Sequence, residues 1–249
     1  MTGGFKDHFS DRAADYAAYR PHYPPALADY LTSLAPTRRV AWDVGCGSGQ
    51  FSTLLGERFE QVIATDASAE QIARAAAHPH VTYAVAPADR TDIAASSVDL
   101  VTVAQAAHWF DLPRFYDEVE RVARPGAAIA MFAYGITMVD PPVGPVVDDF
   151  YSRVLEAWWP RERRHTENGY RDFDFPFEET DPPEIEMAVD WIVDQFLGYV
   201  GTWSGVRALT AAAGDAPFRM FSMKVRDAWG SAPTRRVSWP LGMRVGTVR

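Results

Sequence analysis

The chain has 249 residues, 47% of them hydrophobic, which suits a folded protein with one large core. Its 24 Lys and Arg residues stand against 33 Asp and Glu residues and give a formal net charge of -9 at pH 7. This acidic balance argues against a nucleic-acid partner, because such partners are bound through clustered basic groups that meet phosphates.

The cysteine count and the hydropathy pattern indicate in which cellular compartment the protein is expected. Cys46 is the sole cysteine, so no intramolecular disulfide can form, which agrees with a reducing compartment. Residues 1–19 lack the basic start and the apolar run of a secretory signal. The longest mostly apolar run, 126–139, is shorter than the roughly 20 residues that a membrane helix needs. We therefore expect a cytoplasmic protein without a membrane partner.

The start of the chain is rich in aromatic residues and prolines. Tyr16 and Tyr19 lie three apart, so they share a face if this segment is helical. The prolines within 21–25 end any such helix, and a new helix is expected over 26–34.

From residue 40 to residue 133, short apolar runs alternate with helical patterns. Continuous apolar strands that alternate with helices are typical of a parallel sheet covered on both faces. Ser68 is expected to cap the helix that it precedes, with Gln71 three residues on. The expected strands are 40–44, 61–66, 81–86, 98–104 and 127–133, and the expected helices are 49–58, 68–77 and 112–123.

The alternation stops after Tyr134. Residues 140–183 hold many prolines, acids and aromatics and indicate an insertion, with a helix of its own over 143–157. The pattern as a whole predicts an α/β protein, a doubly wound and mostly parallel sheet with a helical cap. The later elements are expected at 185–189 (strand), 192–202 and 218–229 (helices), and 236–248 (a closing strand, antiparallel at or near the sheet edge).

Glycines at alternate positions follow the first expected strand, in Asp43-Val44-Gly45-Cys46-Gly47-Ser48-Gly49. Such glycines let a ligand approach the backbone, and the helix that follows offers unpaired N–H groups. A dinucleotide fingerprint needs a glycine where this chain has Gln50, and no Lys-Ser or Lys-Thr pair follows as in a P-loop. The spacing therefore argues against a nicotinamide dehydrogenase. The carboxylate before the turn would repel a pyrophosphate and attract a cation or an amino group.

Three acids lie at the carboxyl ends of three consecutive expected strands: Asp43, Asp66 and Asp89. A carboxylate at Asp66 can accept hydrogen bonds from both hydroxyls of a ribose. One at Asp89, next to Ala88, can accept from an adenine amine. A single acid of this kind could merely cap the next helix, whereas three together indicate a ligand site. The pattern fits an adenosine ligand with a cationic or zwitterionic tail, and S-adenosylmethionine is such a ligand.

With these residues, the chain resembles the class I S-adenosylmethionine-dependent methyltransferases. The segments Tyr19-Arg20-Pro21-His22-Tyr23-Pro24, Ala107-His108-Trp109-Phe110-Asp111 and Gly198-Tyr199-Val200-Gly201-Thr202-Trp203-Ser204 are similar to segments of the trans-aconitate methyltransferase group. The resemblance implies a Rossmann-like fold with a seven-stranded sheet, S-adenosylmethionine as cofactor, and methyl transfer to a small-molecule acceptor such as a carboxylate. We expect one domain with a lid segment (1–35), a cofactor core (36–137), a cap with a returning strand (138–215) and a closing helix and strand (216–249).

The resemblance also implies roles for individual residues. Tyr16, Tyr19 and Arg20 would form a lid over the cofactor, and Asp43 would lie near its ammonium group. No metal ligand set is expected, and the protein would be a monomer or a homodimer. The cofactor-binding residues implied are Tyr19, Arg20, Asp43, Gly45, Gly47, Gly49, Asp66, Ala67, Ala88, Asp89 and Gln105. The acceptor-binding residues implied are Tyr16, Tyr23, His108, Trp109, Trp159 and Trp203.

His108 is the candidate catalytic residue. A carboxylate acceptor needs no general base, whereas a hydroxyl acceptor does, and an imidazole with a near-neutral pKa suits that role. The alternatives that His108 merely holds a loop, and that Trp109 and Trp203 pack in the core, stay open. So do two other functions, methylation of oxygen or carbon in a larger natural-product or quinone-like acceptor, and cofactor binding without catalysis. Four arginines could bind an anionic acceptor or form a solvated face: Arg161, Arg163, Arg164 and Arg171.

Overall fold

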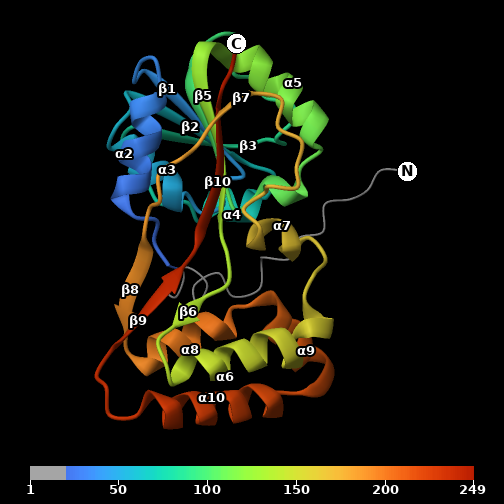
Figure 1. Cartoon of the computed structure of the whole chain (residues 1–249). Coiled ribbons are helices and arrows are strands. Elements are labelled where there is room, and N and C mark those ends of the chain that lie inside the picture. The colour runs from blue at the N-terminus through green and yellow to red at the C-terminus, as the bar shows by residue number, and fades with distance from the viewer. Residues whose placement is uncertain (1–20) are drawn as a thin grey trace.

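The computed structural model describes residues 21–249 (Figure 1). Their main features are a large sheet and a layer of helices, with a small three-stranded sheet between the two (Figure 1). The predicted lid residues Tyr16, Tyr19 and Arg20 lie outside the described residues, so the lid stays a prediction.

The large sheet confirms the predicted doubly wound, mostly parallel arrangement of seven strands, in the order β3-β2-β1-β4-β5-β10-β7. β1 pairs in parallel with β2 and with β4, whereas β10 runs antiparallel to both β5 and β7. The strands are β1 (Val40–Val44), β2 (Gln61–Asp66), β3 (Val81–Val85), β4 (Val98–Ala104), β5 (Ala123–Tyr134), β7 (Glu178–Thr180) and β10 (Leu241–Thr247).

Apolar side chains cover both faces of this sheet. Leu27 and Phe51, from two different helices, pack on one face, and Phe115 packs on the other. Strand β4 is buried along nearly its whole length, as expected of a parallel strand between two helical layers. The helices of this half are α2 (Pro25–Leu34), α3 (Gln50–Gly56), α4 (Ala69–Ala73) and α5 (Leu112–Val122).

The cap extends the apolar core beyond the carboxyl ends of the parallel strands. Figure 1 shows α6, α8, α9 and α10 gathered there, and Phe196 and Phe221 of this layer belong to the same buried cluster as Phe51. The Phe221 ring is stacked on Phe150 with 4.0 Å between centroids. The cap elements are α6 (Val143–Asp149), a π-helical turn (Phe150–Val154), a 3-10 turn (Glu156–Trp158), α7 (Arg163–Glu167), α8 (Val193–Gly201), α9 (Ser204–Ala213) and α10 (Ala216–Trp229).

The predicted single closing strand over 236–248 is in fact two strands. β9 (Arg235–Trp239) belongs to the small sheet of order β6-β9-β8, and only β10 enters the large sheet. Pro240 lies between them, and a proline has no N–H to continue the ladder. The strand expected at 185–189 is β8 (Met187–Trp191), which pairs with β9 in this small sheet, as does β6 (Met138–Val139).

Two helical predictions also need correction. The helix expected to reach residue 77 ends at Ala73, and the backbone N–H of Ala76 instead donates to the Ser48 carbonyl in the glycine turn, at 3.1 Å. Helix α9 has no counterpart in the prediction, because Trp203-Ser204-Gly205 reads as a break. A Cβ at Gly205 would stand 3.0 Å from the Trp159 ring, so the glycine is there for close packing of this helix.

Among residues 21–249, no helix is long and apolar enough to cross a membrane. The longest helical run that the structure describes without interruption is α10, with 14 residues. A bilayer span needs roughly 20.

Candidate active site

The turn after β1 has the left-handed backbone that its glycines permit, with φ of 65° at Gly45, 56° at Gly47 and 80° at Gly49. A Cβ on Gly49 would stand 2.1 Å from the Tyr83 hydroxyl, and one on Gly45 would stand 2.5 Å from Cβ of Ala106. The turn is thus wedged between β3 and the segment after β4. Within residues 21–249, a Cβ on Gly47 would meet a single atom, at 4.0 Å, so this part of the structure leaves the turn open at Gly47.

Asp43 supports this turn from inside the sheet. Its side chain is fully buried, and its carboxylate accepts hydrogen bonds from the hydroxyls of Ser52 (2.6 Å) and Thr102 (2.9 Å). Burial raises the pKa of Asp43 to about 6, in spite of these two bonds. The carboxylate therefore ties β1 to α3 and β4, while its predicted place beside an ammonium group stays a prediction.

Asp66 lies at the open side of the turn. Its two carboxylate oxygens accept hydrogen bonds from the backbone N–H groups of Gly47 and Ser68, each at 2.8 Å. A carboxylate has about four lone-pair sites, so two such bonds leave capacity for a ligand. Ala67 beside it is exposed, and the Ser68 hydroxyl caps α4 as predicted, by accepting from the N–H of Gln71 at 3.3 Å.

The glycine turn carries a negative electrostatic environment. Burial, together with the charges of Asp43 and Asp66, raises the pKa of the Cys46 thiol. Two carboxylates beside an open backbone suit a ligand whose charged groups are cationic and oppose one that brings a pyrophosphate. The residues present therefore fit an adenosine ligand with a sulfonium and an ammonium group.

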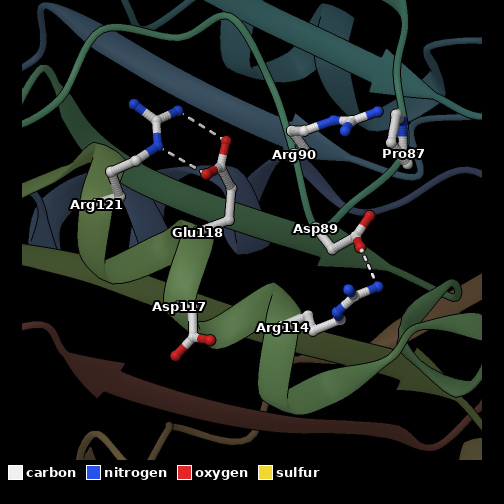
Figure 2. A pocket seen from close by; sticks show the side chains of 7 residues that line it. All are labelled: Pro87, Asp89, Arg90, Arg114, Asp117, Glu118 and Arg121. Carbon is white, nitrogen blue, oxygen red and sulfur yellow. Dashed lines mark hydrogen bonds and ion pairs between the residues drawn. The ribbon is translucent and has the colours of Figure 1, made fainter.

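The third predicted acid, Asp89, lies in the loop between β3 and β4. It lines a pocket of about 440 Å³ together with Pro87, Arg90 and four residues of α5 (Figure 2). The guanidinium of Arg114 approaches its carboxylate to 3.4 Å, and because the Arg114 side chain is largely exposed this ion pair is weak. Ala88 is half-buried and packs on the apolar layer beneath α5.

Gln105 follows β4 with a φ of 57°, which is uncommon for a residue that has a side chain. Its backbone N–H donates to the Phe132 carbonyl at 2.9 Å, and its side-chain amide donates to the Tyr134 carbonyl at 3.1 Å. The end of β5 thus holds this strained conformation. Strained residues of this kind cluster at functional sites, which supports a site at the ends of β4 and β5.

His108 lies just beyond, in the 3-10 turn η1 (Ala107–Trp109). Its Nδ1 atom is 3.1 Å from the Tyr170 hydroxyl, and its ring is 4.8 Å from the Trp109 ring. Burial lowers the pKa of His108 to about 4; the neighbouring His165 and Arg163 act in the same direction, and the charge of Glu162 acts against it. The near-neutral pKa expected for this residue is therefore wrong, because the imidazole is neutral at pH 7 and a weak base.

Tyr170 is the residue of this site that the sequence did not predict. It is fully buried with a φ of 63°, and it follows Gly169 with a φ of 65°. A Cβ on Gly169 would stand 2.7 Å from the backbone of Gly242, so the insertion lies directly on β10. Two left-handed residues in a row turn the insertion toward η1. The pair Asn168-Gly169 is the only turn signal there, and it does not reveal which tyrosine follows it into the site.

The other predicted acceptor residues that the structure describes lie in different surroundings. Trp109 is 43% exposed beside His108. Tyr23 is buried with its ring 5.4 Å from Phe51 and 5.3 Å from Phe132. Trp203 is buried in the cap, 5.8 Å from Trp159. Tyr23 and Trp203 are therefore core residues in this structure, whereas Trp109 lies beside His108 and Trp159 packs on Arg163.

Among the four arginines considered for an anionic acceptor, Arg163 is the one with a built environment. Its guanidinium lies over the rings of Trp159 (3.9 Å) and Tyr151 (4.7 Å). Its Nε donates to the Tyr151 hydroxyl and to Glu167 at 3.1 Å. Its terminal N–H groups have no hydrogen-bond partner within residues 21–249. Two aromatic faces thus fix a guanidinium whose fork residues 21–249 do not use.

No group of three or more His, Cys, Asp or Glu residues in the part of the chain that the structure describes could hold a metal ion.

Residues 42–131 match the family model for a methyltransferase domain. A candidate methyltransferase of Dictyostelium discoideum is 33% identical over 212 residues, which cover 84% of this chain and 81% of that protein. An uncharacterized methyltransferase of Mycobacterium tuberculosis is 39% identical over 124 residues, 49% of this chain and 50% of that protein.

A solved structure from Anaeromyxobacter dehalogenans, described as a candidate type II methyltransferase, is 49% identical. It superposes with a TM-score of 0.88 over 92% of this chain and 98% of that chain. Extensive identity over most of two relatives, together with the negative, open glycine turn, establishes the family. The chain belongs to the class I S-adenosylmethionine-dependent methyltransferases, and S-adenosylmethionine is its cofactor.

Proposed function

We propose that this methyltransferase acts on a small-molecule acceptor and methylates a carboxylate of that acceptor. The observation that carries the proposal is the environment of His108, whose Nδ1 lies 3.1 Å from the Tyr170 hydroxyl and whose partial burial lowers its pKa to about 4. A carboxylate is ionised at neutral pH and reacts without losing a proton, whereas a hydroxyl needs a base. An imidazole with this pKa accepts a proton poorly, which favours a carboxylate over a hydroxyl-bearing natural-product or quinone-like acceptor.

Arg163 supports the same class of acceptor. Its terminal N–H groups can bind a carboxylate with two parallel hydrogen bonds, and the aromatic rings on which it lies limit its motion. Arg163 begins helix α7, which contacts η1, so Arg163 and His108 belong to one region of the structure. The net charge of -9 supports a small acceptor over a nucleic acid.

The residues around the glycine turn hold the cofactor in this proposal. The sulfonium of S-adenosylmethionine supplies an activated methyl group. Asp66 accepts hydrogen bonds from the ribose, Asp89 lies beside the adenine, and the open backbone at Gly47 lies against the methionine part. Asp43 acts indirectly, since both of its oxygens already hold the turn in place. The protein then contributes mainly alignment of the acceptor and exclusion of water.

A panel of carboxylic acids and of hydroxylated aromatic compounds, offered with isotopically labelled S-adenosylmethionine, tests the proposal. Methyl esters of the acids are expected, because a carboxylate is already ionised at neutral pH and needs no base. Methylated hydroxyl products alone would contradict it.

The role of Arg163 is tested with the acid that the panel identifies. Arg163→Met is expected to raise the KM for that acid at least about tenfold, because a bidentate charged contact is lost. The dissociation constant of S-adenosylhomocysteine should stay unchanged. Arg164→Met is the matched control, since Arg164 is next to Arg163 in the chain but is exposed. Equal effects of the two substitutions would rule out Arg163 as the anchor.

A further inference from the structure

The loop between β3 and β4 contains Ala88 and Asp89 but has no helix or strand of its own over residues 86–97. Such a loop presents a ligand-binding group in one place only where other contacts fix it. Its first fixed point is Ala86, whose backbone N–H donates to the Asp66 carbonyl at 3.1 Å. The short stretch 87–90 follows before the next fixed point.

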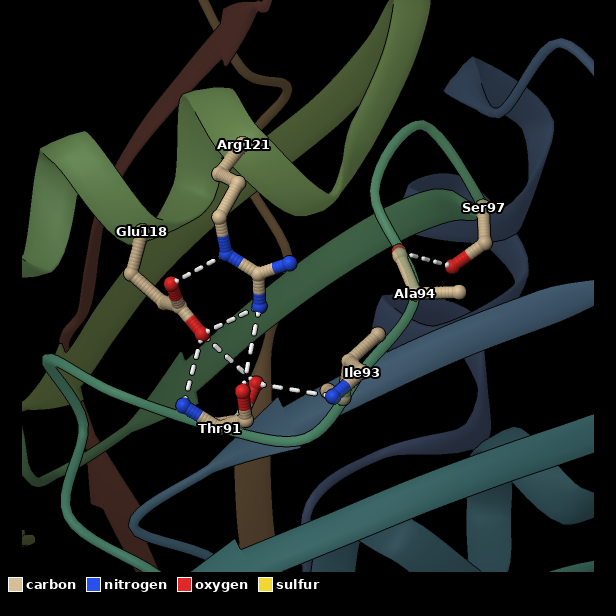
Figure 3. A network of polar contacts seen from close by, with 6 residues as sticks. All are labelled: Thr91, Ile93, Ala94, Ser97, Glu118 and Arg121. Carbon is tan, nitrogen blue, oxygen red and sulfur yellow. Dashed lines mark hydrogen bonds and ion pairs between the residues drawn. The ribbon is translucent and has the colours of Figure 1, made fainter.

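That second fixed point is Thr91. Its backbone N–H and its hydroxyl both donate to Oε1 of Glu118, each at 2.7 Å (Figure 3). The Thr91 hydroxyl oxygen also accepts from the N–H of Ile93 at 3.3 Å, and the Ile93 side chain is buried. Thr91 is thus joined both to helix α5 and to the apolar layer under the loop.

Glu118 is itself held by Arg121. The Nε of Arg121 donates to Oε2 of Glu118 at 2.7 Å, and a terminal nitrogen donates to Oε1 at 2.8 Å (Figure 3). The same terminal nitrogen reaches the Thr91 carbonyl at 3.2 Å. The Glu118 side chain is only 7% exposed, so this two-pronged pair is better shielded from water than a surface ion pair. The bonds from Arg121 hold the pKa of Glu118 below its usual range, so it is ionised at neutral pH.

The spacing on α5 explains how one helix can brace the loop. Arg114, Glu118 and Arg121 are four and three residues apart and therefore share a face, which lines the pocket beside the loop (Figure 2). Phe115 and Val119 on another face are fully buried in the core. A helix anchored by its apolar face thus offers a charged face to residues 87–91.

We propose that Thr91, Glu118 and Arg121 form a clamp that positions residues 87–90 and so makes the enzyme select an adenine base. The clamp residues do not touch the ligand and are positioning residues. The inference rests on the proposed function, in which Asp89 lies beside the adenine. What it adds is that discrimination between purines depends on an ion pair behind the loop.

The test compares calorimetric dissociation constants of S-adenosyl-L-homocysteine and S-inosyl-L-homocysteine, in which a carbonyl oxygen replaces the adenine amine. Wild-type protein is expected to bind the adenosyl ligand about tenfold more tightly, because the inosyl ligand lacks the donor that Asp89 would meet. Glu118→Gln and Thr91→Val should each lower this ratio at least about threefold, since residues 87–90 then sample more positions.

Two control variants should keep the wild-type ratio. Thr91→Ser retains the hydroxyl that bonds Glu118. Glu120→Gln makes the same chemical change as Glu118→Gln at an exposed position of the same helix, whose side chain has no partner within residues 21–249. Thr91→Val removes only one hydroxyl and remains decisive if Glu118→Gln does not fold.

An equal loss of affinity for both ligands, with the ratio unchanged, would show that the clamp only stabilises the fold and would overturn the proposal. Failure of the proposed function has a different signature. Wild-type protein itself would then bind the two ligands equally, which would overturn the assignment of Asp89 to adenine, and the clamp's role with it, before any substitution is made.

Discussion

The two sides of the candidate active site are positioned by different parts of the chain. At the glycine turn, Asp43 is held by Thr102 of the adjacent strand β4, and Asp66 by backbone N–H groups of the turns after β1 and β2. At η1, His108 is held by Tyr170, which lies 62 residues further along the chain, in the insertion. The first side follows from the order of the strands, whereas the second depends on where an insertion folds.

The two sides also differ in how their buried charges respond to pH. Asp43 has its pKa raised to about 6, and His108 has its pKa lowered to about 4. Burial acts against the charged form in both residues, but one is an acid and the other a base. Protonation in the folded state is therefore favoured at the turn and disfavoured at η1.

The largest effect of a single substitution is expected at the glycine turn. Gly49→Ala should lower the free energy of unfolding by about 3 kcal/mol, from the cost of a left-handed alanine and the displacement of the Tyr83 ring. Gly126 has a φ of 81°, close to the 80° of Gly49, but a Cβ there would meet no atom of the described residues within 4 Å. Gly126→Ala should therefore lose only about 1–2 kcal/mol. Equal losses in urea denaturation would mean that the turn is not wedged against β3.

Much of the turn could be predicted from the sequence, for a physical reason. Strand β1 has the bounds that its apolar run indicates. Asp43, Asp66 and Asp89 all lie at or after the carboxyl ends of their strands, and parallel strands present these ends on one side of the sheet. The hydroxyl partners of Asp43 could not be predicted, since Ser52 and Thr102 belong to two elements whose contact only the folded sheet defines.

Far less of the insertion could be predicted from the sequence. Among the aromatic candidates outside the insertion, nothing local distinguishes Tyr23 and Trp203, which pack in the core, from Trp109, which lies beside His108. Tyr170 went unnoticed because its role depends on a left-handed backbone and on contact with β10. Likewise, helix α9 could not be predicted, because Gly205 reads as a helix break in the sequence. In the structure this glycine lies inside the helix and allows close contact with Trp159.

The next largest effect concerns pH at η1. Between pH 6.5 and 4 the unfolded His108 binds a proton and the folded one does not, so the folded state loses stability as pH falls through this window, by at most about 3 kcal/mol. His108→Gln removes this loss. The difference in unfolding free energy, wild type minus variant, should therefore fall between pH 6.5 and 4 and then level off.

The turn supplies a control of opposite sign for that experiment. Between pH 3.8 and 6 the folded Asp43 binds a proton more readily than the unfolded one, so it adds stability as pH falls. In wild-type protein the opposite effects of the two residues on stability partly cancel. The difference between wild type and His108→Gln isolates the effect of His108, and the variant alone shows that of Asp43. A difference that stays flat with pH in His108→Gln would mean that His108 is not buried as described.

In the proposed arrangement, the cofactor lies at the glycine turn with its ribose on Asp66. Asp66 also holds the turn, through Gly47 and Ser68, so a loss of affinity in Asp66→Ala does not by itself identify a ribose contact. A second ligand, the 2′-deoxy form of S-adenosylhomocysteine, separates the two effects in a double cycle.

Calorimetric titration of both ligands into wild-type protein and Asp66→Ala is the most direct measurement. Wild-type protein should bind the 2′-deoxy ligand about tenfold more weakly than the parent ligand, because one hydrogen bond to a charged group is lost. In Asp66→Ala both affinities should fall and become equal. A tenfold preference that persists unchanged in Asp66→Ala would contradict the assignment and place the ribose elsewhere.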